Sequence, residues 1–172
     1  RKEEFQHDMF RPPTHHVIKG KLNAEGFLEA LEHDFVSGDV ATDSALIPNT
    51  LTNFLGADVG AIRGGFIQYT AVPNFKAVHW HVTLPFATSW WRSLGLLANT
   101  FAMESFMDEM AIKAKKNAVD FRLAQIGDDT IDVRLKKVIR AAAEKANYTE
   151  DIIDGKAMGF AASIDANTPC AQ

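Results

Sequence analysis

The chain has 172 residues, of which 47% are hydrophobic, 10% aromatic and 23% charged. Its formal charge of -4 disfavours nucleic-acid binding, which needs a basic face that neutralises phosphates. No apolar stretch approaches the roughly 18 residues of a membrane span, and the single Cys170 cannot form an internal disulfide. We therefore expect one domain, or part of one, over residues 1–172, with a core that needs no disulfide.

The first half of the chain predicts strands. Residues 17–22 and 27–36 alternate on either side of a short turn that contains a glycine, so they predict a hairpin. Residues 37–65 lose this periodicity and predict an irregular connection, with one short helix near 51–55. Residues 75–82 alternate again and predict a third strand.

The second half predicts helices. Asn99 is expected to cap the first, because an apolar stripe with the period of a helix follows it. This stripe consists of Met103, Phe106, Met107, Met110, Ala111 and Ala114. A short helix is expected over 118–126, and a longer one that starts at Asp128 or Asp129 and ends at Asn147. The stripe of the longer helix consists of Ile131, Leu135, Val138, Ile139, Ala142 and Ala146.

The order of the elements indicates the fold class. Antiparallel strands followed by two or three helices predict an α+β fold rather than an alternating parallel one. Residues 156–164 are small and apolar, and they predict a strand with no partner after it. Because the chain also begins at Arg1 without a methionine, we expect it to be a piece of a longer protein.

The histidines offer a weak metal site. His79 and His81 point to one side of the expected strand, where two imidazoles could share a zinc or copper ion. A closed site needs about four ligands, and no third ligand stands at a telling spacing. His15 and His16 point to opposite faces of a strand and cannot chelate together. The remaining histidines are expected to be isolated polar surface residues: His7 and His33.

Motifs for several other chemistries are absent from the sequence. It contains no Gly-x-Ser-x-Gly nucleophile elbow, no Gly-x-x-x-x-Gly-Lys phosphate loop and no Gly-x-Gly-x-x-Gly dinucleotide fingerprint. Gly64 and Gly65 predict a turn rather than a ligand cradle. Cys170 stands beside Pro169 without a neighbouring base, so we do not expect a nucleophile there.

The stretch 89–95 is the most informative. Trp90, Trp91, Arg92 and Gly95 stand directly before an expected helix. They place a cation and free backbone amides where an anionic group, such as a phosphate or a pterin cofactor, could rest. In the competing interpretation the tryptophans anchor the core and Arg92 is a surface or ion-paired residue. Taken alone, the residues favour this second interpretation.

Five stretches of the sequence, in this order, resemble the large subunit of the molybdenum hydroxylases. They are 1–12, 22–26, 69–74, 91–95 and 101–111. The last two, Trp-Arg-Ser-Leu-Gly and Phe-Ala-Met-Glu-Ser-Phe-Met-Asp-Glu-Met-Ala, are the most specific, and together they are similar to the isoquinoline 1-oxidoreductase branch, in its beta subunit. The resemblance covers most of the chain and is poorest over 39–67.

The resemblance implies a molybdenum-dependent oxidoreductase that hydroxylates N-heterocycles or oxidises aldehydes with water as the oxygen source. It implies a molybdopterin, often in the cytosine dinucleotide form. The implied partners are the remainder of the large subunit and a small 2Fe-2S subunit that takes the electrons, with a cytochrome c as a further acceptor. A periplasmic or membrane-associated parent fits this branch, and the localisation stays open.

The resemblance also implies site residues. The cofactor contacts fall on Trp91, Arg92, Ser93 and Gly95, and the substrate contact falls on Leu94. Leu94 stands where purine-oxidising relatives have an aromatic residue, which argues against a purine-like substrate. The family's catalytic glutamate lies in a glycine-rich motif that this chain lacks, and Glu104 is not its counterpart. We therefore expect the chain alone to be inactive and free of cofactor.

Two other functions stay open. One is a binding or scaffold module that keeps the fold without the cofactor. The other is a small metal-binding protein that uses His79 and His81. Tight stoichiometric zinc binding would distinguish the latter from both other functions.

Overall fold

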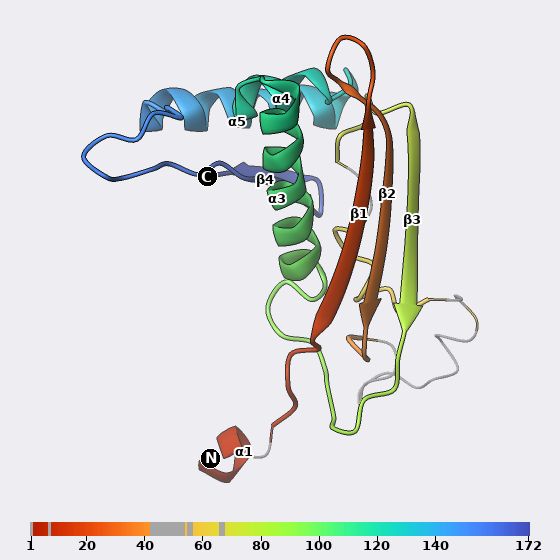
Figure 1. Cartoon of the computed structure of the whole chain (residues 1–172). Helices are drawn as coiled ribbons and strands as arrows, with labels where there is room; N and C mark the ends of the chain where they lie inside the picture. Colours follow the sequence, from red (N-terminus) through yellow and green to blue (C-terminus); the bar gives the residue numbers. More distant parts are fainter. Residues whose placement is uncertain (1, 7, 42–53, 55–56, 66–67) are drawn as a thin grey trace. The chain divides into compact units, whose positions relative to one another are not determined.

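The structure is a computed structural model that describes residues 2–6, 8–41, 54, 57–65 and 68–172 (Figure 1). The chain divides into two compact units. The first unit comprises Arg1–Val17, His33–Phe66 and Ala77–Asn99, and the second comprises Ile18–Glu32, Ile67–Lys76 and Thr100–Gln172. Each unit combines segments that are far apart in the sequence. The expectation of one domain, or part of one, over residues 1–172 stays a prediction.

Three strands form a sheet in the order β1–β2–β3. They are β1 Thr14–Leu22, β2 Leu28–Ser37 and β3 Asn74–His81. All three expected strands are confirmed, although β1 begins three residues before its expected start at Val17. Each strand contributes residues to both units.

The turn between β1 and β2 is organised by Asn23. Its side-chain oxygen accepts hydrogen bonds from the N–H groups of Glu25 and Phe27, at 3.1 and 2.8 Å. Gly26 has a φ of 76°, which a glycine adopts without strain. The expected hairpin is confirmed, and its geometry follows from these two residues.

Strand β3 lies beside β2 and runs in the same direction (Figure 1). In the second unit, Lys76 Nζ lies 2.9 Å from Glu32 Oε1. In the first unit, further along both strands, the N–H of Val82 donates to the Ser37 carbonyl at 3.0 Å. Neighbouring parallel strands need a long connection, and residues 38–73 supply it.

Helices follow the sheet, so the α+β class is confirmed. They are α3 Leu96–Ala114, α4 Ala118–Ala124 and α5 Thr130–Ala146, and a short helix α1 spans Lys2–Gln6. The helix expected near 51–55 falls largely outside the described residues. Among the described helices, none combines the length and the apolar character that a bilayer crossing requires.

Asparagines set the ends of two helices. Asn117 caps α4, because its side-chain oxygen accepts from the Val119 N–H at 3.0 Å. Asn147 ends α5 in the left-handed region with a φ of 49°, and its N–H donates to the Glu144 carbonyl at 3.1 Å. Asp129 precedes α5 as expected, without a side-chain cap bond.

Asn99 does not cap α3, contrary to the expectation. The helix begins at Leu96, and the Asn99 N–H already donates to the Gly95 carbonyl at 2.9 Å. Its buried side-chain amide instead donates to the carbonyls of Ala61 and Arg63, both at 2.9 Å. A capping side chain and a loop anchor use the same polar groups, so the pattern alone could not separate them.

The main hydrophobic core lies in the second unit. The stripe expected on α3 is confirmed, since Met103, Met107 and Met110 are all buried. Leu135 and Ile139 of α5 are fully buried in the same core. Each such side chain stabilises the fold by about 1.5–3 kcal/mol relative to an exposed one. Further members are Leu28, Leu31, Tyr69, Val72, Phe121, Ile126 and Phe160.

The C-terminal segment is a hairpin, which corrects the expected strand at 156–164. The strand β4, Ala162–Asp165, is shorter and pairs antiparallel with β5, Thr168–Ala171. The expectation that no partner follows is therefore wrong. Ala166 and Asn167 have φ values of 45° and 60°, and a two-residue hairpin turn can require positive φ at both positions. The turn contains no glycine, so the usual sequence signal is missing.

Candidate functional site

The 91–95 loop forms two overlapping turns directly before α3. The N–H of Leu94 donates to the Trp91 carbonyl, and the N–H of Leu96 donates to the Ser93 carbonyl, both at 2.9 Å. Ser93 and Leu94 have φ values of 77° and 52°, a region that residues with a Cβ seldom occupy. Such strain persists where the surrounding structure fixes the backbone, and it clusters at ligand sites.

Gly95 is fixed by lack of space. Its N–H donates to the Gly60 carbonyl at 3.0 Å. A Cβ at this position would lie 2.2 Å from the Ala61 carbonyl oxygen and 2.8 Å from that of Gly60. Both obstacles are backbone atoms, so glycine alone fits at the end of the loop.

A buried carboxylate holds the segment against which the loop rests. Asp58 Oδ1 accepts from the N–H groups of Gly60 and Ala61 at 2.8 and 3.1 Å. Its Oδ2 accepts from those of Val40 and Ala41 at 2.8 and 2.9 Å. These bonds compensate the burial of the charge. Sequence reasoning missed Asp58, although an aspartate two residues before a glycine is a common turn signal.

Arg11 holds the loop from a segment that is distant in the sequence. Its Nη2 donates to the Arg92 carbonyl at 3.0 Å, and its Nη1 donates to the Leu94 carbonyl at 3.5 Å. The guanidinium carbon lies 6.0 Å from the centre of the Trp91 ring. The indole N–H of Trp91 donates to the Met9 carbonyl at 2.9 Å. The loop backbone is thus fixed from two sides.

The aromatic and cationic side chains of the loop reach solvent. Trp90 and Trp91 are 43% and 51% exposed, so neither is a core anchor. Arg92 is exposed, and among the described residues its side chain forms no ion pair or hydrogen bond. The cavity between Leu94, Gly95 and their surroundings measures about 20 Å³, enough for about one water molecule. A larger ligand would have to meet the outer side of the loop.

The pair His79 and His81 shows no metal geometry. His79 Nε2 lies 2.8 Å from Ser37 Oγ, and His81 Nε2 lies 2.6 Å from Asp39 Oδ1. Among the described residues, no group of three or more His, Cys, Asp and Glu side chains could hold a metal ion. Both imidazoles therefore have local hydrogen-bonding roles.

His33 is buried, so the expectation of a surface residue is wrong. Its exposed fraction is 0%, and its Nε2 lies 3.0 Å from His16 Nδ1. It shares the inward face of β2 with Leu31 and Phe35, as the alternation of the strand could have indicated. His15 is exposed and His16 is partly buried. His7 lies outside the described residues.

The second unit contains a buried ion pair that sequence reasoning also missed. Glu104 accepts from Arg122 Nε at 2.9 Å, from Tyr69 Oη at 2.5 Å and from Gln68 Nε2 at 3.0 Å. The Ala162 N–H donates to it at 2.8 Å. Burial raises the pKa of Glu104, and the charge of Arg122 opposes that rise. The protein itself fills the acceptor positions of this carboxylate, which gives Glu104 a structural role.

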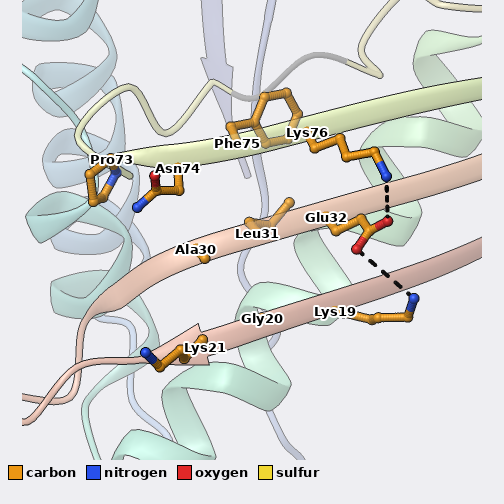
Figure 2. A pocket seen from close by; sticks show the side chains of 10 residues that line it. All are labelled: Lys19, Gly20, Lys21, Ala30, Leu31, Glu32, Pro73, Asn74, Phe75 and Lys76. Carbon is orange, nitrogen blue, oxygen red and sulfur yellow. Dashed lines mark hydrogen bonds and ion pairs between the residues drawn. The ribbon is translucent and has the colours of Figure 1, made fainter.

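A hollow of about 550 Å³ lies over the strands of the second unit (Figure 2). Lys19 and Lys76 flank Glu32, with Nζ atoms 4.0 and 2.9 Å from its carboxylate oxygens. Lys21 pairs with Glu29 at 3.0 Å. Because each lysine has an acidic neighbour, the hollow has little net field with which to select a charged ligand. These pairs connect neighbouring strands.

Comparisons with known proteins find relatives in sequence and in fold. No family model matches the chain. In sequence it is similar to one of the subunits of nicotinate dehydrogenase from Pseudomonas putida, with 26% identity over 168 residues, which cover 88% of this chain and 14% of that protein. The chain therefore spans a small part of the length of this relative.

Two solved structures share the fold. The aldehyde oxidoreductase of Desulfovibrio gigas matches with a TM-score of 0.56 and 20% identity. The aldehyde oxidoreductase of Desulfovibrio desulfuricans matches with a TM-score of 0.59 and 17% identity. Each match covers 86% of this chain and 17% of the other. Likeness of sequence and of fold supports the expected resemblance to a segment of the molybdenum hydroxylases.

Proposed function

We propose that this chain is a segment of a molybdenum-dependent oxidoreductase and that its 91–95 loop contacts the molybdopterin. The enzyme would hydroxylate N-heterocycles or oxidise aldehydes with water as the oxygen source. One observation carries the proposal: the exposed Arg92 guanidinium and the exposed Trp91 ring lie on a loop whose backbone is fixed from two sides.

The loop residues fit a flat, anionic group. The Arg92 side chain forms no hydrogen bond or ion pair within the described part of the chain, and a guanidinium matches phosphate oxygens with two parallel N–H donors. Trp91 offers a large apolar ring beside it. Ser93 adds a partly exposed hydroxyl, and Gly95 lets the loop close tightly on its support. Leu94 offers an apolar contact, which suits its proposed role toward substrate.

When bound, a molybdopterin supplies the two-electron oxidation of the substrate. The residues of this chain would bind and orient the cofactor through Arg92 and Trp91, and the described residues offer no free base beside them. Glu104 cannot serve, because Arg122, Tyr69 and a backbone N–H occupy its carboxylate. We therefore propose that the proton acceptor comes from other parts of the enzyme.

We also propose finer assignments, which the sequence resemblance alone supports. These are the cytosine dinucleotide form of the cofactor, the isoquinoline 1-oxidoreductase branch and a small 2Fe-2S subunit as electron acceptor, with a cytochrome c beyond it. The remainder of a large subunit would be the main partner of this chain.

The test replaces Arg92 within the longest natural polypeptide that contains this sequence. The protein is produced in a host that makes molybdopterin cofactors, and molybdenum is measured by elemental analysis. Arg92→Gln removes the charge, and we expect molybdenum occupancy to fall about tenfold, the equivalent of one lost charge-assisted contact. The matched control Arg140→Gln changes an exposed arginine of α5 and should leave the occupancy unchanged.

Three outcomes separate the alternatives. Molybdenum in the wild-type protein that depends on Arg92 supports the proposal. Molybdenum that is indifferent to Arg92 keeps the enzyme class and removes the site. A wild-type protein without molybdenum removes the enzyme class and favours the scaffold module.

A further inference from the structure

The buried imidazole of His33 and the partly buried imidazole of His16 form a hydrogen-bonded pair in the first unit. His16 Nδ1 lies 3.0 Å from His33 Nε2, and the rings stack with centroids 5.3 Å apart. His33 Nδ1 lies 3.4 Å from the Gly65 carbonyl oxygen. These partners assign the tautomers. His33 carries its proton on Nδ1, toward Gly65, and His16 donates from Nδ1 to the bare Nε2 of His33.

This arrangement has no place for another proton. His16 Nε2 is buried and lacks a hydrogen-bond partner among the described residues, so a proton there would create a cation without an acceptor. A proton on His33 Nε2 would face the N–H of His16. Either event favours rotation of the His16 ring toward water and the loss of the pair.

The surroundings of the pair offer little compensation for a positive charge. The Phe35 ring stacks on His16, with centroids 6.0 Å apart, and lies tilted against His33, with centroids 4.8 Å apart. The nearby titratable groups are His15 on β1, Asp34 on β2 and His79 on β3. His79 in turn interacts electrostatically with Asp58 and His81. Of these, only Asp34 acts on His33 as a negative charge.

A short chain of contacts leads from the pair to the 91–95 loop. Gly65 closes a turn by donating its N–H to the Ile62 carbonyl at 2.8 Å. Gly60 and Ala61 lie in the turn directly before it, which the Ile62 N–H closes by donating to the Asp58 carbonyl at 3.1 Å, and their own carbonyls accept from the Gly95 N–H and the Asn99 side chain. Added bulk at Gly65 would meet the Phe35 ring at 2.6 Å, so the turn also packs on the aromatic partner of the pair.

We propose that the His16–His33 pair is a pH-sensitive support of the 91–95 loop. The neutral pair holds the Gly65 carbonyl and with it the 60–65 turn. Protonation separates the rings, frees the turn and weakens the hydrogen bonds that Gly95 and Asn99 make to it. The inference concerns the conformation of this chain, and it holds whether or not the loop contacts a cofactor.

The acid–base properties agree with this geometry. Burial, together with the charge of His33, lowers the pKa of His16 from 6.5 to about 4. Burial also lowers the pKa of His33. Both rings are therefore neutral near pH 7, and their protonation belongs to acidic conditions.

The experiment follows imidazole nitrogens and backbone amides in the wild-type chain by NMR between pH 7.5 and 4. We expect both rings to stay neutral below the pH at which a free imidazole is half protonated. The protection of the Gly95 N–H against hydrogen exchange should then fall at least about tenfold, with the same midpoint as His16. The Phe121 N–H, which donates to the Asn117 carbonyl at 2.8 Å in the second unit, is the internal reference and should change less than about twofold.

Variants separate the imidazoles from the carboxylates. His15→Gln, on the exposed face of the same strand, should behave as wild type. The double variant His16→Gln with His33→Gln cannot titrate there and should lose the pH dependence at Gly95. If Gly95 still loses protection in the double variant, the two imidazoles are not the cause and the proposal is overturned. If the double variant does not fold, the wild-type midpoints decide, because a Gly95 transition whose midpoint differs from that of His16 overturns the proposal equally.

Discussion

The 91–95 loop of the first unit and the Glu104–Arg122 ion pair of the second unit are each held in place, by different kinds of interaction. The 91–95 loop rests on backbone hydrogen bonds to Gly60 and on the Arg11 guanidinium, and its tryptophans reach solvent. Glu104 and Arg122 lie inside a hydrophobic core whose side chains surround them. The loop is positioned without being covered, as a ligand site requires, whereas the ion pair is covered and fully bonded.

This difference predicts where a substitution acts. In the second unit a lost charge leaves its partner buried, so the whole unit should lose stability. In the first unit a lost contact should change the loop more than the global stability, because water can replace it. The predictions below test this difference, starting with the largest expected effect.

Glu104→Gln should have the largest effect. It removes the negative charge next to Arg122, which has 0% exposure, and leaves the guanidinium with the partly exposed carboxylate of Asp108, 2.8 Å from its Nη1. We expect a loss of about 3–5 kcal/mol in the free energy of unfolding by urea denaturation. Lys21→Ala breaks the exposed pair with Glu29 and should cost less than about 1 kcal/mol. If both variants lost the same free energy of unfolding, the buried pair would contribute no more to stability than an exposed pair.

Gly95→Ala should have the second largest effect on stability. The new methyl group would meet the carbonyl oxygens of Ala61 and Gly60, and neither can move without disturbing the bonds to Asp58. Such overpacking costs about 1–3 kcal/mol. The loss should appear as reduced exchange protection of the Asn99 N–H. Gly159→Ala adds a methyl group to open space and should change nothing, so a similar effect in both variants would contradict the steric argument.

A fall in pH should destabilise the first unit by less than the Gly95→Ala substitution does. The pKa of His16 is lowered to about 4 in the folded state, so between pH 6.5 and 4 the unfolded chain binds more protons there. The contribution of His16 to the free energy of unfolding is therefore fully present above pH 6.5 and is lost as the pH falls toward 4. The His16 side chain is only partly buried, and with solvent screening we expect about 1 kcal/mol. Urea midpoints at pH 7, 5.5 and 4.5 measure the loss, which should be smaller in His16→Gln than in wild type.

Arg11→Ala should have the smallest effect on global stability and a clear effect on the loop. It removes the donors to the Arg92 and Leu94 carbonyls and the cation beside Trp91. Hydrogen exchange of the Trp91 indole N–H should become about threefold to tenfold faster, the equivalent of one exposed hydrogen bond. The free energy of unfolding should change by less than about 1 kcal/mol. An Arg140→Ala control should leave the indole unchanged, and an unchanged indole in Arg11→Ala would show that Arg11 does not hold the loop.

Much of the fold could be predicted, because it rests on local periodicity. The methionine stripe of α3 and the apolar stripe of α5 repeat every three to four residues, and the strands alternate every two. The errors arose where a polar residue has a distant partner. Asn99 was expected to cap a helix, whereas it binds a loop near Ala61. His33 was expected at the surface, whereas it pairs with His16 across two strands.

The cofactor contacts assigned to the 91–95 loop stay a prediction. The resemblance drew attention to Trp91, Arg92 and Gly95, and the structure places them together on one strained loop. Nothing local marked Arg11, because its partners are about 80 residues away in the chain, and the local turn signal at Asp58 did not indicate its bonds to Val40 and Ala41, which lie 17 and 18 residues away. A spacing pattern contains no information on contacts of this length.

The sequence by itself determined the order of strands and helices, the buried stripes and the likeness to the molybdenum hydroxylases, since each of these follows from neighbouring residues or from an ordered motif. The tertiary structure alone decided which charges are buried, which imidazoles meet and what supports the 91–95 loop. The physical reason is that burial and hydrogen bonding depend on segments that chain folding brings together, and the energy of a polar group depends on those neighbours far more than on its position in the chain.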